Sequence, residues 1–410
     1  MDAPFPFGFP GPTIFYFVLF TLTWAIHTAL VDYVLGGAAW LVWTSSTGRA
    51  QSVAEEGRAA GLLRDWLPLT LSAAVTVGVA PLLFIQILFQ THFYSAQVLL
   101  WIQWTLVGPA LILGFYLLYV HKERLLVHRA RWLQILNAVV CAACFAFPAA
   151  CWTANYLLSV NQSIWPKYYA GEVSVFASLP YLFRLGSWFA AAVPTWAAIV
   201  ALQSWADGAD DPKPTDVEPA EKPYDDAGER QTLAKLAFIG LGVASLLGLA
   251  YILTLPWSVS GRVFGVMGGP WLLLGIIGVG LQIYSWLQLR NSPIWNRTWL
   301  ATLSGGVVAT LLGAAGVRET IRWATMAADP LTNLEALYAQ HADSFGLQGQ
   351  PLFFTFAALN TAAALFCVWL IRRANRISPD HSAEEIGAEP GETSDGSQGG
   401  TARGEVGAEG

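Results

Sequence analysis

The sequence predicts an all-α integral membrane protein with about nine transmembrane helices. Of its 410 residues, 55% are hydrophobic and only 12% are charged, whereas soluble domains carry roughly 25% charged residues. Long apolar runs recur along the chain, each close to the ~20 residues that a helix needs to cross a bilayer. A globular enzyme built around one hydrophobic core does not show this pattern. We therefore expect a multi-pass membrane protein.

Hydropathy identifies nine apolar runs of this length. The first has neither a basic region nor a small-residue cleavage site before it, so it is predicted to be a retained span rather than a signal peptide. Spans one to five fall within residues 1–203, and spans six to nine fall within residues 232–376. The predicted spans are 13–43, 67–89, 97–120, 132–159, 177–203, 232–255, 267–289, 298–317 and 351–371.

Two polar segments interrupt this apolar chain. Residues 204–231 form an acidic, proline-rich linker, and residues 377–410 form a tail rich in Gly, Ser, Glu and Ala. Neither can bury enough apolar surface to offset the entropy lost on ordering, so both are predicted to be disordered. Most acids lie in these two segments, and no basic patch indicates nucleic-acid binding.

The basic residues predict the orientation in the membrane. With the N-terminus outside, 17 of the 22 Lys and Arg residues fall in segments on the inner side and four fall on the outer side. Positive charges gather on the cytoplasmic side of membrane proteins. We therefore expect an outer N-terminus and a cytoplasmic C-terminus, which an odd number of spans requires.

The four cysteines all lie in predicted spans. They are Cys141, Cys144, Cys151 and Cys367. Cys141 and Cys144 form a CxxC motif, but no histidine follows it, so it is not a c-type haem attachment site. Packing as small apolar side chains is the expected role.

The first span carries two ionisable residues, His27 and Asp32, near its middle. Such residues are costly inside a bilayer and usually mark a function. A neutral imidazole at His27 either ligates haem iron or bonds to a neighbouring helix. Gly36 and Gly37 permit close approach of a neighbouring helix or of a flat macrocycle. Asp32 lies about 140° around the helix from His27, so the two should not share a face.

Two further residues are candidates for cofactor binding. Arg184, in the fifth span, suits a haem propionate, a lipid headgroup or an acidic side chain, or it snorkels to the outer interface. A salt bridge to Asp32 is less favoured because Asp32 lies deeper. Met267, at the start of the seventh span, either ligates haem iron axially or fills a packing gap.

The predicted outer loop at 317–350 is the largest outer segment. Arg318, Glu319 and Arg322 stand at helical spacing at its start. This pattern predicts a short amphipathic helix at the membrane surface, as a docking face for a partner subunit or a quinone headgroup, or simply as a solvated charged face. The histidines outside the spans show no metal-ligand spacing, and these are His92, His121, His128, His341 and His381.

Four stretches together resemble the haem-bearing subunit I of cytochrome bd-type quinol oxidases, and more closely its divergent bacterial relatives found with multihaem cytochromes. They are WAIHTALVDYVLGGAAWLV, GVAPLLFIQILFQTHFYSAQVLLW, RVFGVMGGPWLLLG and GVRETIR. The likeness covers most of residues 10–375. It implies a place in the bacterial cytoplasmic (inner) membrane and nine spans with an outer N-terminus. It also implies a haem ligated by His27 and a methionine ligand at Met267.

The chain also departs from this family. The fifth span has Arg184 near the place of a haem-ligating histidine, and the third span lacks the acids of the oxygen-reducing site. The resemblance further implies that a glutamate near the end of span eight is replaced by the small residues 313–316. The outer quinol-binding loop between spans six and seven is short. Dioxygen reduction is therefore not expected.

Three functions compete. The first is a bd-like subunit of a respiratory electron-transfer complex, which binds one or two b-type haems and passes electrons between quinone and a c-type cytochrome partner. If it is enzymatic, it is a quinol-linked oxidoreductase as part of that complex. The second is a haem-free paralogue that anchors other subunits. The third is a transporter with Asp32 and Arg184 as coupling charges, which is disfavoured because no internal repeat is visible.

Overall fold

The computed structural model describes residues 9–47, 58–126, 128–210 and 226–344, together with scattered positions between 351 and 369. The chain divides into two compact units, Met1–Phe345 and Gly346–Gly410, and the helices described below belong to the first. Every regular element among the described residues is a helix. The prediction of an all-α, multi-span membrane protein is therefore confirmed.

Eight candidate spans are long and apolar enough to cross a membrane within the described residues. The third combines α4 (Trp101–Thr105) with α5 (Val107–Lys122). The ninth predicted span, 351–371, falls where only scattered positions are described. The other seven are α1 (Gly11–Thr47), α2 (Arg58–Leu88), α6 (Arg131–Ser159), α8 (Leu179–Asp210), α9 (Asp226–Leu253), α11 (Gly269–Leu289) and α12 (Arg297–Ala328).

The helices extend beyond several predicted boundaries. α8 continues to Asp210 and α9 begins at Asp226, so both ends of the predicted linker 204–231 are helical. Residues 211–225 and the predicted tail 377–410 lie outside the described residues. α12 continues to Ala328, so the first twelve residues of the predicted outer loop 317–350 extend the eighth span.

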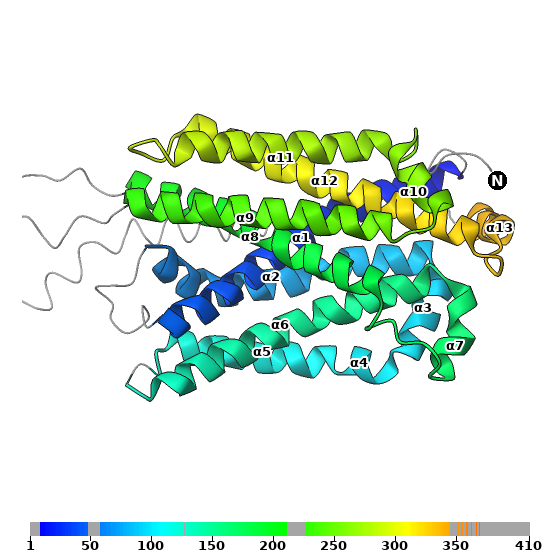
Figure 1. The fold of residues 1–410 in the computed structure, drawn as a ribbon, viewed down its shortest axis with the longest axis horizontal. Helices are drawn as coiled ribbons and strands as arrows, with labels where there is room; N and C mark the ends of the chain where they lie inside the picture. The colour runs from blue at the N-terminus through cyan, green and yellow to red at the C-terminus, as the bar shows by residue number, and fades with distance from the viewer. Residues whose placement is uncertain are drawn as a thin grey trace, which may run out of the picture. The chain divides into compact units, whose positions relative to one another are not determined.

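Short helices gather at one end of the bundle. They are α3 (Gln90–Leu99), η1 (Gln162–Ile164), α7 (Trp165–Tyr169), α10 (Trp257–Phe264) and α13 (Leu334–Ser344). In Figure 1, α3, α7, α10 and α13 lie at the end where α1 begins, whereas the α5–α6 and α11–α12 connections lie at the opposite end. Within the described part of the first unit, the short helices predicted to be outside the membrane thus share one end of the bundle, and the α5–α6 and α11–α12 connections predicted to be inside share the other.

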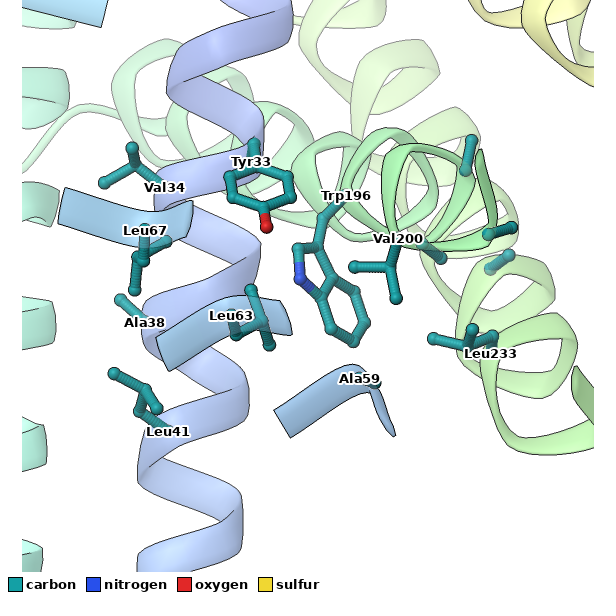
Figure 2. Close-up of a cluster of buried hydrophobic side chains, with 14 of the residues drawn as sticks. Tyr33, Val34, Ala38, Leu41, Ala59, Leu63, Leu67, Trp196, Val200 and Leu233 are labelled. Carbon is teal, nitrogen blue, oxygen red and sulfur yellow. The ribbon is translucent and has the colours of Figure 1, made fainter. Parts of the chain in front are cut away.

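The core forms where α1, α2, α8 and α9 meet. Figure 2 shows Trp196 of α8 beside Tyr33 of α1 and Leu63 of α2, and all three are almost fully buried. Trp196 packs directly against Gly36, where a Cβ atom would collide with the indole, and Leu67 fills the space beside Gly37. Neighbouring helices, rather than a macrocycle, therefore occupy the space beside this glycine pair.

Helix α12 has two different faces. Gly313 lies so close to α11 that a Cβ atom there would be 2.5 Å from the Gly275 nitrogen, and Gly316 packs against the Trp271 ring. Small residues permit this backbone approach between membrane helices. Arg318, two residues beyond Gly316, points to the opposite side of the helix, because successive residues turn by about 100°.

The described cysteines are buried and unpaired, as predicted for packing residues. Cys141, Cys144 and Cys151 are free thiols on α6. The Cys141 Sγ lies 3.7 Å from the Gly114 carbonyl oxygen of α5. Cys367 lies outside the described residues.

Candidate functional site

His27 is half-buried in α1 and is fixed by α2. Its Nδ1 atom lies 3.0 Å from the Ala74 carbonyl oxygen. The ring lies over Gly78, where a Cβ atom would be 2.6 Å from Cε1. A carbonyl oxygen only accepts hydrogen bonds, so Nδ1 carries the proton and Nε2 keeps its lone pair. A hydrogen bond from one ring nitrogen to a carbonyl is the usual support of a metal-ligating histidine.

Asp32 faces a different helix from His27, as the helical spacing predicted. Its carboxyl is 1% exposed, and Oδ1 accepts a hydrogen bond of 3.1 Å from the Trp188 indole of α8. His27 instead contacts α2. Neither His27 nor Arg184 pairs with Asp32 among the described residues, so the two ionisable groups of α1 act in separate surroundings.

Arg184 turns inward against aromatic rings. Its guanidinium lies 3.7 Å from the centre of the Tyr156 ring and 5.4 Å from that of Tyr251. Nη1 also donates to the Tyr251 hydroxyl at 3.5 Å. Cation–π contacts of this kind stabilise a desolvated arginine by about 2 kcal/mol. The side chain is half-buried, and no carboxylate pairs with it in the described part of the chain.

Arg318, Glu319 and Arg322 form a buried ion-pair cluster in α12. Arg318 Nε donates to Glu319 Oε1 at 2.7 Å, and Arg322 Nε donates to Glu319 Oε2 at 2.9 Å. The three residues are 5%, 2% and 1% exposed. The expectation of a solvated surface helix is therefore wrong here. Glu319 places a carboxylate in the last third of α12, three residues beyond the small residues 313–316.

The cluster joins α12 to α1 and α6. The Arg318 guanidinium lies 4.0 Å from the centre of the Trp24 ring, and that of Arg322 lies 4.7 Å from the Tyr156 ring. The Tyr156 hydroxyl donates to the Arg318 carbonyl at 2.8 Å. Arg318 Nη2 is buried without a hydrogen-bond partner among the described residues. Arg184 contacts the same Tyr156 ring, so this tyrosine connects a third guanidinium group to the cluster.

Met267 lies in the turn between α10 and α11 and is half-buried. Helix α11 packs on the glycine face of α12, whereas α1 packs on its arginine face. The structure connects Arg184 to the ion-pair cluster through the Tyr156 ring.

A second polar network fixes the end of the bundle that holds the short helices. The Gln162 amide nitrogen lies 2.9 Å from His92 Nε2, and because an amide NH₂ only donates, Nε2 is the acceptor. Asp329, just beyond α12, accepts hydrogen bonds from the Ser163 and Leu331 backbone nitrogens at 3.0 and 2.9 Å. Burial lowers the pKa of His92 to about 4, with Arg322 adding to the shift and Asp329 opposing it.

We expect this end of the bundle to lose stability as the pH falls from about 6.5 to about 4. In the unfolded chain His92 binds a proton near its ordinary pKa of about 6.5, whereas the folded protein resists protonation until about pH 4. The stabilisation is therefore complete above pH 6.5 and decreases below it. The loss is at most about 3.5 kcal/mol, since a tenfold change in proton affinity is worth about 1.4 kcal/mol. Unfolding midpoints measured across this range should fall less steeply in His92→Gln than in the wild type. Identical pH profiles would contradict this role for His92.

Comparisons with protein-family models, curated proteins and solved structures find no match for this chain. No group of three or more His, Cys, Asp or Glu side chains among the described residues has a metal-binding arrangement. A haem needs only one or two axial ligands, so such a group is not required for haem. The function must be inferred from the chemistry of His27 and the buried cluster.

Sequence reasoning missed the cluster, although a local signal was present. No proline or glycine separates Gly316 from Ala328, so nothing in this stretch breaks the helix of the eighth span. Hydropathy ended that span at the first charges. The partners Trp24 and Tyr156, from distant parts of the chain, supply the contacts that let the charges be buried.

Proposed function

We propose that the protein is a b-type haem-binding subunit of a membrane respiratory electron-transfer complex. It would pass electrons between quinone and a c-type cytochrome partner without reducing dioxygen itself. The observation that carries this proposal is the state of His27, whose Nδ1 is held by the Ala74 carbonyl. The lone pair on Nε2 is thereby kept for a metal, which is what an axial haem ligand requires.

The buried cluster supports the same assignment. A haem carries two negatively charged propionates and supplies one-electron chemistry when bound. Arg184, Arg318 and Arg322 exceed Glu319 by two positive charges, and buried charges need partners. Trp24, which contacts Arg318, lies one turn before His27 on α1. These residues fit the charge of a haem, with His27 as the iron ligand and the arginines as propionate partners.

Met267 is the second candidate ligand in this proposal. The resemblance implies a methionine ligand, and Met267 is the candidate for a second haem. Arg184 stands near the place of the family's fifth-span histidine and does not ligate iron, so the proposal rests on one haem held by His27. The absence of carboxylates from residues 97–120 supports electron transfer without oxygen reduction, because the family's oxygen-reducing site uses acids there.

The partners follow from the arrangement of the bundle. The end with α3, α7, α10 and α13 would face the outer side of the bacterial inner membrane, as the distribution of positive charge predicts. A c-type cytochrome subunit would dock there, close to the buried cluster. Quinone would reach the haem from within the bilayer.

The test is the haem content of the purified protein. The full chain is expressed with added haem precursor, purified in mild detergent, and examined by reduced-minus-oxidised absorption spectroscopy. We expect a b-type α-band and about one haem per chain, as a single free ligand nitrogen implies. A protein that folds but shows no haem band would overturn the proposal.

The competing candidate is a haem-free subunit that anchors partner proteins. One observation favours it: the His27 ring lies directly against Gly78 of α2, so one side of the ring is already occupied by that helix. On this alternative, His27 is a packing residue, and its replacement leaves assembly of the complex intact. Copurification of the same partner subunits with wild-type and His27→Ala chains, both without haem, would favour it.

A further inference from the structure

Asp32 is a buried acid that the proposed electron transfer does not use. It is 1% exposed in the middle of α1, and the Trp188 indole donates to it at 3.1 Å. A carboxylate offers about four acceptor sites, so this indole fills only one of them. A charged carboxylate in these surroundings would be poorly solvated.

Thr195 is the second polar neighbour of the acid. Its hydroxyl lies within hydrogen-bonding reach of the Asp32 carboxyl and lies 3.1 Å from the Ala191 carbonyl oxygen. A hydroxyl carries one proton, so it donates to only one of these two acceptors at a time. Even when Thr195 donates to Asp32, a charged carboxylate in this place has few donors around it.

No cation among the described residues compensates Asp32. Helix α1 packs against α2, α6, α8 and α12, and His27 on α1 itself faces α2. Arg184 is engaged by tyrosines, and the arginines of α12 are engaged by Glu319. The titratable and charged groups on the described parts of these four helices include Arg64, Asp65, Cys141, Cys144, Cys151, Tyr156, Tyr181, Arg184, Arg318, Glu319 and Arg322. None forms an ion pair with Asp32.

We propose that Asp32 binds and releases a proton as the redox state of the haem at His27 changes. This inference rests on the proposed function. The two residues are five positions apart on α1, a rise of about 7.5 Å, so the charge at one is felt at the other through a medium of low dielectric constant. An oxidised haem centre carries a positive charge. This charge would compensate the Asp32 carboxylate, which has no cation partner among the described residues.

The coupling is a one-electron, one-proton exchange. If His27 holds a haem, its reduction by quinol would remove the positive charge beside α1. The Asp32 carboxylate would then take one proton from water, and a new O–H bond would form on its oxygen. On reoxidation by the c-type cytochrome, that O–H bond would break and the proton would return to water. Charge inside the membrane would stay balanced in both states, which the low dielectric constant favours.

The first experiment measures the haem midpoint potential against pH in the wild type, in Asp32→Asn and in Tyr33→Phe. The asparagine keeps the size of the side chain and an acceptor for Trp188. Tyr33 is a buried neighbour bonded to Gln203 and serves as the matched control. We expect the wild-type and Tyr33→Phe potentials to fall by up to about 59 mV for each tenfold drop in proton concentration, and that of Asp32→Asn to stay constant. A wild-type potential independent of pH, or a slope retained in Asp32→Asn, would overturn the proposal.

A second experiment separates this proposal from haem binding. Infrared spectroscopy of the haem-free protein at neutral pH reads the carbonyl stretch of a protonated carboxyl directly. Without a nearby positive charge, Asp32 should be protonated, so we expect a band that shifts in D₂O, is lost in Asp32→Asn and is kept in Tyr33→Phe. If the wild type binds no haem but shows this band, the proposed function fails while the proton site stands. Absence of the band would contradict the proposal that Asp32 binds a proton.

Discussion

Replacing His27 with alanine is expected to remove the bound haem. The imidazole Nε2 is the one candidate ligand atom on α1, and its Nδ1 is already committed to Ala74. Loss of a supporting partner of a metal ligand typically lowers metal affinity by ~10–100-fold, so loss of the ligand itself should lower haem affinity by at least that much. The number of haems per chain, measured on purified wild-type and His27→Ala protein, should be correspondingly lower in the variant. The α-band of the difference spectrum should disappear with it.

The matched control is His341→Ala. His341 is also buried, at 0% exposure, and its Nε2 also donates to a carbonyl oxygen, that of Leu88, at 3.0 Å, but it lies on α13, outside the candidate membrane spans. This variant should lose packing but keep its haem. Full haem content in His27→Ala would contradict the assignment and would favour the anchoring function. Equal loss in both variants would indicate general unfolding rather than ligand removal.

The parts of the structure that sequence reasoning predicted are those fixed by local pattern. A run of ~20 apolar residues has few alternatives to a membrane helix, so the eight described spans could be located from hydropathy. The separation of His27 from Asp32 follows from the 3.6-residue turn, and the contacts with Ala74 and Trp188 confirm it. Burial of the α6 cysteines follows from their position in such a run.

The buried cluster could not be predicted in this way, because its stability depends on side chains far away in the sequence. Read alone, Arg318 and Arg322 indicate the end of a span. In the fold, Trp24 from α1 and Tyr156 from α6 cover their guanidinium groups. A hydropathy window contains no information on such contacts. The same holds for Arg184, whose tyrosine partners come from two other helices.

Glu319→Gln should produce the largest loss of stability in this protein. Glu319 is the shared acceptor for Arg318 and Arg322 at 2.7 and 2.9 Å, and all three are almost fully buried. The amide keeps the shape of the side chain but removes the charge, so both guanidinium groups lose their counter-ion. Removing one partner of a buried ion pair costs about 3–5 kcal/mol. Equilibrium unfolding of haem-free protein in mixed detergent micelles measures this change directly.

The matched control is Asp65→Asn, which breaks an ion pair at the surface. Arg64 and Asp65 lie 3.4 Å apart with side chains 24% and 58% exposed, and such pairs contribute about 0–1 kcal/mol. A loss of under about 1 kcal/mol in both variants would contradict a buried cluster. If the arginines also bind propionates, added haem should restore part of the stability of Glu319→Gln, because the haem carboxylates then replace the missing charge. That recovery should be absent in Glu319→Gln combined with His27→Ala, since the haem is no longer held beside the arginines.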